Sequence, residues 1–174
     1  MKLVILDRDG VINIDSANFI KNPNEWLPIA GSLEAIALLN QSGIARGLFD
    51  MVTLKSIHDK MHRALALVGG RIDALFYCPH AADDNCNCRK PKTGMIEDIG
   101  RRFSIELNKV YGIGDAYRDL QAFADAGCKP ILVRTGKGEE TLAQAENADK
   151  PLPKNTLVFA DLNEAVQHII AEEA

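Results

Sequence analysis

The chain lacks the features that would point to a membrane, a secretory route or a nucleic acid. None of its apolar runs approaches the roughly 20 residues that span a bilayer, and no charged leader with a cleavable apolar region precedes the first predicted strand. The formal net charge is −4, and interspersed acidic and basic residues leave no basic face for a phosphate backbone. We therefore expect a cytoplasmic protein that binds neither membranes nor nucleic acid.

Internal repeats and low-complexity tracts are also absent. With 174 residues, 47% of them hydrophobic, the chain can bury the core of one compact domain, and we expect a single domain over residues 1–174. None of the predicted helices carries an evident surplus of apolar residues on its surface, which favours a monomer.

Cysteines are few, and three of the four are crowded into a short polar segment. Two disulfides are one reading, but the chain has no secretory signal. Three thiolates and one imidazole within this segment match the closed tetrahedral site of structural zinc, whereas the alternative is a loop of reduced cysteines. We predict a zinc site with the ligands Cys78, His80, Cys86 and Cys88. A zinc ion would make the loop rigid and so position the two residues after its last ligand, Arg89 and Lys90.

Apolar, β-branched runs alternate with helical patterns along the chain. Strands are predicted at Lys2–Leu6, Ile72–Tyr77, Val110–Ile113, Pro130–Val133 and Leu157–Ala160. Helices are predicted from Ser32, from Thr53, over Gly94–Phe103, over Arg118–Ala126 and from Asp161. This alternation indicates an α/β fold, a parallel sheet with helices on both faces and ligands beyond the carboxyl ends of its strands. One interval breaks the pattern, because no β-like run separates the first two helices.

Two aspartates follow the first predicted strand directly. A lone aspartate at a strand end is usually a cap or turn residue, but Asp7 and Asp9 are two positions apart and Gly10 allows a sharp turn behind them. Like charges held close together need a cation. Asp115 follows another predicted strand and could complete a site for a hard divalent ion, assisted by Asp119 one helical turn further on.

Paired carboxylates beside a divalent cation suit phosphoryl transfer. One carboxylate can attack phosphorus and form an aspartyl-phosphate, while a second protonates the leaving oxygen and later deprotonates water. We expect Asp7 to be the nucleophile and Asp9 the general acid and base. Lys90 is a candidate for the cation that stabilises the transferred group, although a solvated surface lysine is the alternative.

Four motifs occur together and in order: DRDGVIN at 7–13, NQSGIARG at 40–47, CPH…CNCRKP within 78–91 and GIGDAYRD at 112–119. With them the chain resembles the haloacid-dehalogenase-like (HAD) phosphatases. Within these it is most similar to the D-glycero-D-manno-heptose 1,7-bisphosphate phosphatases, relatives of the histidinol-phosphate phosphatases. The resemblance runs over nearly the whole chain, and the cysteine loop joined to CRKP is specific to this subgroup. It implies a Rossmann-like HAD fold without a large cap domain.

The resemblance also implies a function and a set of site residues. The substrate would be a small phosphorylated sugar, and removal of its 7-phosphate would serve the synthesis of lipopolysaccharide inner core or S-layer glycans. Magnesium would be bound by Asp7, the backbone carbonyl of Asp9 and Asp115. Arg89 would hold the phosphate that stays, and Lys90 the one that is cleaved. Further substrate contacts are implied at Asp15, Ser16, Ala17, Asn18, Asn40, Gln41 and Ser42.

The chain departs from the family pattern at one place. Family members carry a helix, a turn, a second β-strand and a threonine before the NQSG residues, whereas here LEAIALL runs directly into NQSG. A turn and a central strand, about eleven residues, are missing. Leu39 stands in place of the threonine that receives the phosphate. Two other readings therefore stay open: a phosphatase for histidinol phosphate or another small phosphomonoester, and a non-catalytic binding protein that retains zinc.

Overall fold

The computed structural model describes residues 3–16, 20–41, 52–81, 83–147 and 150–172. Four parallel strands form one sheet in the order β1-β2-β3-β4. The strands are β1 (Val4–Leu6), β2 (Tyr111–Gly114), β3 (Lys129–Val133) and β4 (Leu157–Phe159). Because all four run in the same direction, the residues that follow them meet at one edge of the sheet.

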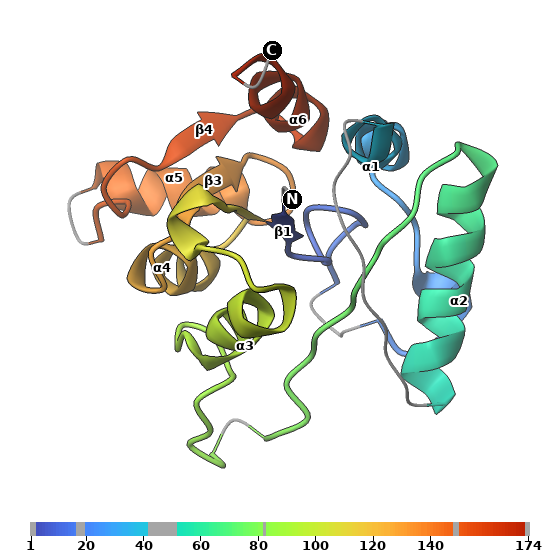
Figure 1. The fold of residues 1–174 in the computed structure, drawn as a ribbon, viewed down its shortest axis with the longest axis horizontal. Coiled ribbons are helices and arrows are strands. Elements are labelled where there is room, and N and C mark those ends of the chain that lie inside the picture. Colours follow the sequence, from blue (N-terminus) through green and yellow to red (C-terminus); the bar gives the residue numbers. More distant parts are fainter. Residues whose placement is uncertain (1–2, 17–19, 42–51, 82, 148–149, 173–174) are drawn as a thin grey trace.

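In the described part of the chain, six α-helices accompany the sheet (Figure 1). They are α1 (Ser32–Gln41), α2 (Val52–Leu67), α3 (Gly94–Phe103), α4 (Tyr117–Asp125), α5 (Gly138–Glu146) and α6 (Leu162–Ala171), with 3-10 turns at Pro23–Glu25 and Leu107–Lys109. The side chain of Asp161 accepts a hydrogen bond from the backbone N–H of Glu164, so the predicted cap of the last helix is confirmed. None of the described helices is both long and apolar enough to cross a membrane.

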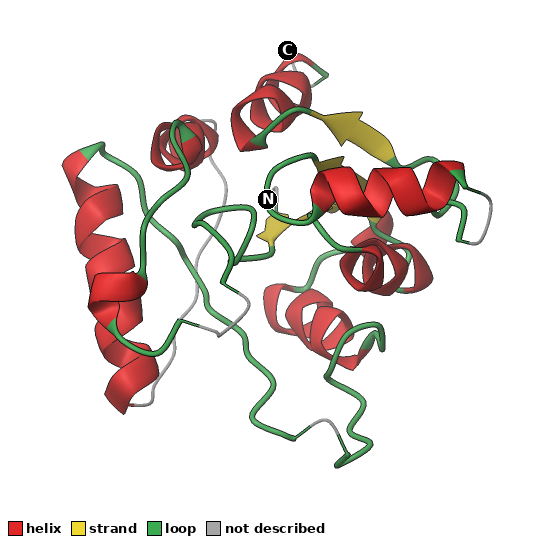
Figure 2. Cartoon of the chain, turned by 180° about the vertical axis from the view of Figure 1, so that it is seen from behind, coloured by secondary structure: helices red, strands yellow, loops and turns green. Residues whose placement is uncertain are grey.

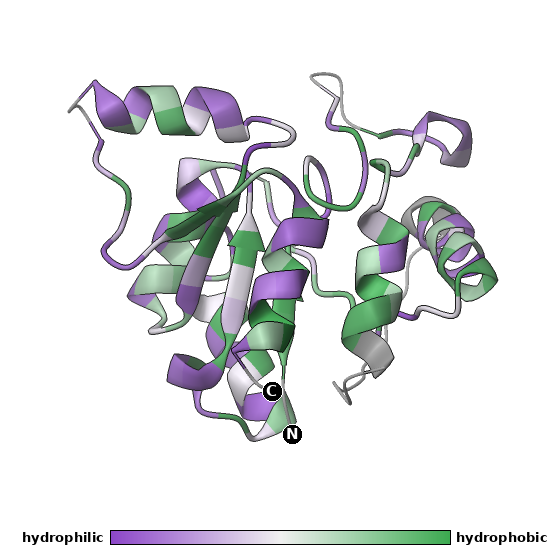
Figure 3. Ribbon diagram, turned by 90° about the horizontal axis from the view of Figure 1, so that it is seen from above, coloured by the Kyte–Doolittle hydropathy of each residue, from purple (hydrophilic) through white to green (hydrophobic). Residues whose placement is uncertain are grey.

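Hydrophobic side chains gather in two clusters on opposite faces of the sheet. One cluster joins the strands to α1, α2 and α6, for example through Ile36, Met61 and Val166. The other joins them to α3 and α4, for example through Ile99 and Phe123. Figure 3 shows hydrophilic and hydrophobic residues mixed along each helix, as expected for helices with one face on a sheet. The predicted α/β arrangement with helices on both faces is confirmed.

The prediction of a strand over residues 72–77 is wrong. These residues belong to none of the four strands and are drawn as loop in Figure 2. They follow α2 and run toward the cysteine-rich segment (Figure 1). A strand is defined by its pairing, and β1, at the edge of the described sheet, pairs only with β2. The apolar pattern of this segment is therefore real, but no neighbouring strand lies within reach of it in the described part of the chain.

Candidate active site

Three carboxylates come together where β1 and β2 end. Asp7 follows β1, Asp115 follows β2, and Asp119 lies in the first turn of α4. Each offers an oxygen within 4.8 Å of the other two, and both Asp115 and Asp119 are buried. The prediction that Asp7 and Asp115 lie together at the carboxyl edge of the sheet is confirmed, and Asp119 joins them as expected.

Lys90 reaches into this cluster from the segment before α3. Its Nζ lies 2.6 Å from Oδ1 of Asp7 and 2.8 Å from Oδ1 of Asp119, so one ammonium bridges two carboxylates. The same ammonium lies over the ring of Phe123, which excludes water from one side. The alternative of a solvated surface lysine is therefore wrong.

The cluster carries more negative charge than Lys90 can balance. Burial raises the pKa of Asp115 to about 6, with Asp119 and Asp7 adding to the effect of burial. Burial also raises the pKa of Asp7, although Lys90 opposes the shift. Burial would lower the pKa of Lys90, but Asp7 and Asp119 outweigh it and the pKa is raised. Three acidic groups around one cation have the charge and the oxygen donors that a hard dication requires.

The carboxylate of Asp9 is held apart from the other three. Arg8 donates to both of its oxygens, through Nε at 2.9 Å and Nη2 at 2.8 Å, and Asn13 donates through Nδ2 at 2.9 Å. The cluster of nearby ligand oxygens among the described residues does not include Asp9. Arg8 and Asn13 were not predicted as site residues. Asn13 is fully buried, which the sequence pattern gave no reason to expect.

A second unpredicted element is the loop after β3. We interpreted residues 135–141 as a turn before a helix, yet this loop closes over Asp115. The backbone N–H of Lys137 donates to Oδ2 of Asp115 at 2.8 Å, and the hydroxyl of Thr141 donates to the carbonyl of Asp115 at 2.8 Å. The position directly after a parallel strand was the signal that could have identified it.

Two glycines make this close approach possible. Gly10 and Gly136 both have positive φ, at 84° and 58°. A Cβ atom on Gly10 would lie 2.0 Å from Oδ2 of Asp115, and one on Gly136 would lie 2.2 Å from the same oxygen. Neither position can therefore carry a side chain while Asp115 keeps its place. The site is built around the Asp115 carboxylate.

The expected substrate residues are described only in part. Asp15 lies near the cluster and its Oδ2 pairs with Nζ of Lys137 at 2.7 Å, which holds the pKa of Asp15 below its usual range. The backbone N–H of Ser16 donates to Oδ1 of Asp15 at 2.8 Å. Ala17, Asn18 and Ser42 lie outside the described residues, as do the side chains of Asn40 and Gln41 at the end of α1.

The cysteine-rich segment folds into a cluster as well. The sulfur of Cys78 lies 3.5 Å from that of Cys86 and 3.4 Å from that of Cys88, and Nδ1 of His80 lies 3.2 Å from the sulfur of Cys88. With metal–sulfur bonds of about 2.3 Å, tetrahedral ligands are separated by about 3.7 Å, so these separations suit zinc. Cys128 is buried elsewhere and takes no part, as predicted.

Arg89 and Trp26 have roles that the structure describes directly. Arg89 is exposed and donates from Nη1 to the carbonyl of His80 at 3.1 Å, so it braces the cysteine loop. Trp26 is fully buried, and its Nε1 donates to Oδ1 of Asn13 at 3.0 Å. This hydrogen bond anchors the loop that carries Trp26 to Asn13. The two residues therefore support the cysteine loop and the Asp9 loop respectively.

Comparison with known proteins identifies close relatives over the full chain. A family model described as HAD-hydrolase-like matches residues 87–165. The D-glycero-β-D-manno-heptose-1,7-bisphosphate 7-phosphatase of Bordetella bronchiseptica is 54% identical over 183 aligned positions, which cover 99% of each chain. The protein of the same name from Neisseria meningitidis serogroup A is 48% identical, covering 100% of this chain and 97% of its own.

The aligned length carries information of its own. The Bordetella alignment extends over 183 positions, nine more than the 174 residues of this chain, so at least nine residues of that relative have no counterpart here. This agrees with the turn and strand that the family pattern predicts and this chain lacks.

Solved structures lead to the same group. The crystal structure of D,D-heptose 1,7-bisphosphate phosphatase from B. bronchiseptica, complexed with magnesium and phosphate, superposes with a TM-score of 0.91 at 50% identity and covers 99% of both chains. The corresponding enzyme from Burkholderia thailandensis gives a TM-score of 0.75 at 42% identity, covering 98% of this chain and 99% of its own. The predicted HAD fold is confirmed, and the chain belongs to the HAD-like hydrolases, in the group of the D-glycero-D-manno-heptose 1,7-bisphosphate phosphatases.

Proposed function

We propose that this chain is a magnesium-dependent phosphomonoesterase that removes the 7-phosphate of D-glycero-D-manno-heptose 1,7-bisphosphate. The observation that carries the proposal is the cluster of Asp7, Asp115 and Asp119 around Lys90, in a chain that aligns over nearly its whole length with phosphatases of that name. A phosphorylated sugar is the substrate class.

Asp7 is the nucleophile in this proposal. It follows β1 directly, and Lys90 opposes the rise in its pKa that burial causes. The oxygen of Asp7 forms a bond to phosphorus while the bond from phosphorus to the leaving sugar oxygen breaks, which gives an aspartyl-phosphate. Lys90 then stabilises the negative charge that is spread over the transferred group.

Asp9 is the general acid and base. Its carboxylate is positioned by hydrogen bonds from Arg8 and Asn13 and does not belong to the cluster of the other three, so we assign it to the leaving oxygen rather than to the metal. It donates a proton to that oxygen and later takes one from the water that hydrolyses the aspartyl-phosphate. One carboxylate in line and one offset is the arrangement that this two-step reaction needs.

The donor set fits magnesium. Asp7 and Asp115 would supply carboxylate oxygens, with Asp119 close enough to support them. The family pattern adds the backbone carbonyl of Asp9 as a third ligand. The raised pKa of Asp115, about 6, marks a buried carboxylate that still lacks full charge compensation. When bound, Mg²⁺ screens the repulsion between the anionic phosphoryl group and the attacking carboxylate.

The rest of the site binds the sugar and its second phosphate. We assign sugar contacts to Asp15 and Ser16, and to Ala17, Asn18, Asn40, Gln41 and Ser42 from the family pattern. Arg89 is assigned to the phosphate that remains on the product. We also propose zinc at Cys78, His80, Cys86 and Cys88, a monomeric protein and a cytoplasmic location, where reducing conditions keep cysteines available as metal ligands.

Phosphate release from heptose 1,7-bisphosphate tests the function. With magnesium present, we expect turnover at rates typical of enzymes, and slower turnover of histidinol phosphate, which has no second phosphate for Arg89. Preference for histidinol phosphate would favour the alternative substrate. A folded protein that releases phosphate from neither compound would contradict the proposal and favour a non-catalytic binding protein.

The variant Asp7→Asn tests the nucleophile separately. It keeps the shape of the side chain but removes its nucleophilic oxygen, so we expect activity to fall by at least about 10³-fold with the melting temperature nearly unchanged. Normal turnover by this variant would show that another residue attacks phosphorus.

A further inference from the structure

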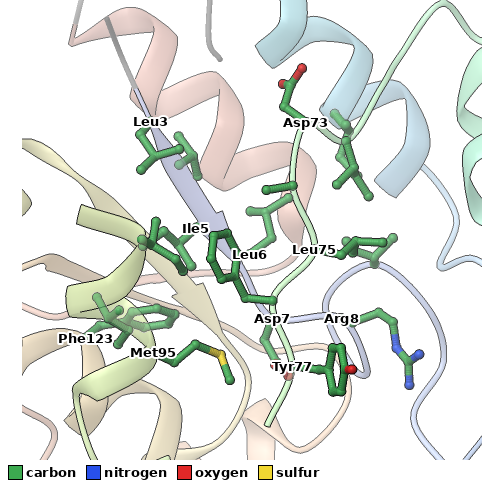
Figure 4. A pocket seen from close by; sticks show the side chains of 18 of the residues that line it. Leu3, Ile5, Leu6, Asp7, Arg8, Asp73, Leu75, Tyr77, Met95 and Phe123 are labelled. Carbon is green, nitrogen blue, oxygen red and sulfur yellow. The ribbon is translucent and has the colours of Figure 1, made fainter. Parts of the chain in front are cut away.

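A cavity of about 360 Å³ lies along the free side of β1. One wall is β1 itself, and the opposite wall is the extended segment 71–77, which Figure 4 shows running alongside β1 with Leu75 and Tyr77 near Leu6 and Asp7. We call this cavity the β1 slot. Its lining is mainly apolar along its length, and at one end it reaches Asp7, Arg8, Asp9 and Lys90.

The two walls present their side chains as neighbouring strands of one sheet do. In β1, Leu6 packs into the core under α1 and α2, whereas Ile5 packs into the core under α3 and α4. In the opposite wall the successive residues Leu75 and Phe76 divide between the same two cores. Alternation between two faces is the mark of a strand. Residues 75 and 76 therefore alternate as in a sheet strand and are separated from β1 by the slot, whereas Ile72 lies in the same core as Leu75 and does not fit this alternation.

The backbone of β1 can pair with an occupant of the slot. The N–H of Asp7 donates to the carbonyl of Ile113 in β2, at 2.8 Å. Backbone groups of successive strand residues point to opposite sides, so those of Val4 and Leu6 point away from β2 and toward the slot. Such an edge accepts an added strand through main-chain hydrogen bonds, with side-chain pockets on both faces providing specificity.

The length of the chain agrees with a strand position that none of the described residues fills. At least nine residues of the Bordetella relative have no counterpart here, and a strand of about five residues with its turn requires that number. The prediction from sequence places the deficit before Asn40, directly after Leu39, whose side chain lines the slot. The missing strand and the cavity are thus found at the same place by independent observations.

We propose that the β1 slot is a binding site for one extended peptide strand, apolar on both faces, that pairs with β1. Apolar side chains on both faces are required because each face of the slot opens onto a hydrophobic core. The bound strand would end beside Asp7 and Lys90, so its occupancy would also change the environment of the active site.

Peptide binding to the full chain provides a direct test. The probe is a synthetic peptide with the sequence of the Bordetella residues that lack a counterpart, labelled for fluorescence anisotropy. We expect saturable binding of one peptide per chain and a melting temperature that rises with peptide concentration. The matched control peptide has proline at its middle position, which removes a main-chain donor and should abolish both effects. The Bordetella enzyme, which contains these residues, should not bind the probe.

Insertion of the same residues into the chain tests the slot without any binding step. Placed between Leu39 and Asn40, they should raise the melting temperature by about 5 °C or more, since they bury apolar side chains in an existing cavity. These measurements do not depend on phosphatase activity. The proposal is overturned if neither the peptide nor the insertion stabilises the protein. It is also overturned if a small apolar dye binds the slot and the peptide does not.

Discussion

Among the described residues, Arg118 approaches Asp119 only to 4.0 Å, whereas Lys90 hydrogen-bonds to two carboxylates of the cluster. It bridges Asp7 and Asp119 at 2.6 and 2.8 Å, while Asp115 is held by the backbone N–H of Lys137. Its position in sequence, two residues after Cys88, ties this charge to the cysteine cluster. Lys90 can therefore keep its contacts with Asp7 and Asp119 only while its backbone is held in place.

Replacement of Lys90 by methionine should therefore disable the enzyme. Without the ammonium we expect phosphatase activity to fall by about 10² to 10³-fold, and the acid limb of the pH–rate profile to move to higher pH because Asp7 loses the cation that lowers its pKa. Steady-state assays between pH 5 and 8 measure both effects. Lys92→Met is the matched control, since Lys92 contacts Asn85 on the surface and should retain activity. Equal losses in the two variants would contradict the assignment.

His58 makes stability depend on pH. It is 8% exposed, and burial, with the nearby charge of Arg8 adding to it, lowers its pKa to about 4, compared with 6.5 in an unfolded chain. Between pH 6.5 and about 4, His58 is therefore protonated in the unfolded state but neutral in the native state. The neutral His58 therefore does not lower stability above pH 6.5. As the pH falls below this value, the free energy of unfolding decreases, by about 2 kcal/mol at pH 5.

Urea unfolding at pH 7 and pH 5 measures this effect. The wild-type free energy of unfolding should fall between the two values by about 2 kcal/mol more than that of His58→Gln, which has no titrating group at this position. The same dependence on pH in both proteins would show that His58 is not responsible.

At the scale of elements, the segment 78–93 connects two sites. Its first part contains the cluster of three cysteines and His80. Within the segment, Arg89 and Lys92 donate hydrogen bonds to backbone carbonyls. The side chain of Lys90 extends from it into the carboxylate cluster. None of the described residues of this segment lies in a helix or a strand. Its order must therefore come from these contacts and, in our proposal, from zinc.

Zinc content can be tested by replacing one ligand. Cys86→Ser should reduce bound zinc from about one ion per chain to well below one, increase proteolysis within the segment, and lower phosphatase activity by releasing Lys90. Elemental analysis and limited digestion provide the measurements. Cys128→Ser is the control and should keep its zinc, because Cys128 lies in the core beside α4. Wild-type protein without zinc after mild purification would refute the site.

The same scale shows what the sequence can and cannot predict. The proximity of Asp7 and Asp115 could be predicted, because parallel strands end at one edge of the sheet. The cysteine cluster could be predicted because its members lie close together in sequence. The side-chain direction of Asp9 could not be predicted, since it is decided by Arg8 and a buried Asn13. The contact of the Lys137 loop with Asp115 was missed, and segment 72–77 was wrongly predicted to be a strand, because both depend on neighbours distant in sequence.

For the whole molecule, the surface favours a single chain. The large apolar side chains that are exposed among the described residues are Ile14, Leu27, Leu67, Leu157 and Val158. Ile14 and Leu27 are neighbours joined by a backbone hydrogen bond, Leu157 and Val158 are consecutive in β4, and Leu67 ends α2. Each of these groups holds at most two such side chains, which does not indicate one broad apolar interface. Light scattering after size exclusion should give a mass near 19.0 kDa at micromolar concentration. A mass near twice this value would show a dimer and would place a second chain against a surface described here as exposed.

Trp26 is the only tryptophan of the chain, and two hydrogen bonds separate it from Asp9. Its ring nitrogen donates to Asn13, and Asn13 donates to the Asp9 carboxylate. Any rearrangement of the Asp9 loop must therefore disturb the surroundings of the indole. The protein thus has a built-in optical reporter: its intrinsic fluorescence, free of background from other tryptophans, would follow events at Asp9, the acid of the proposed mechanism, in real time and without a label.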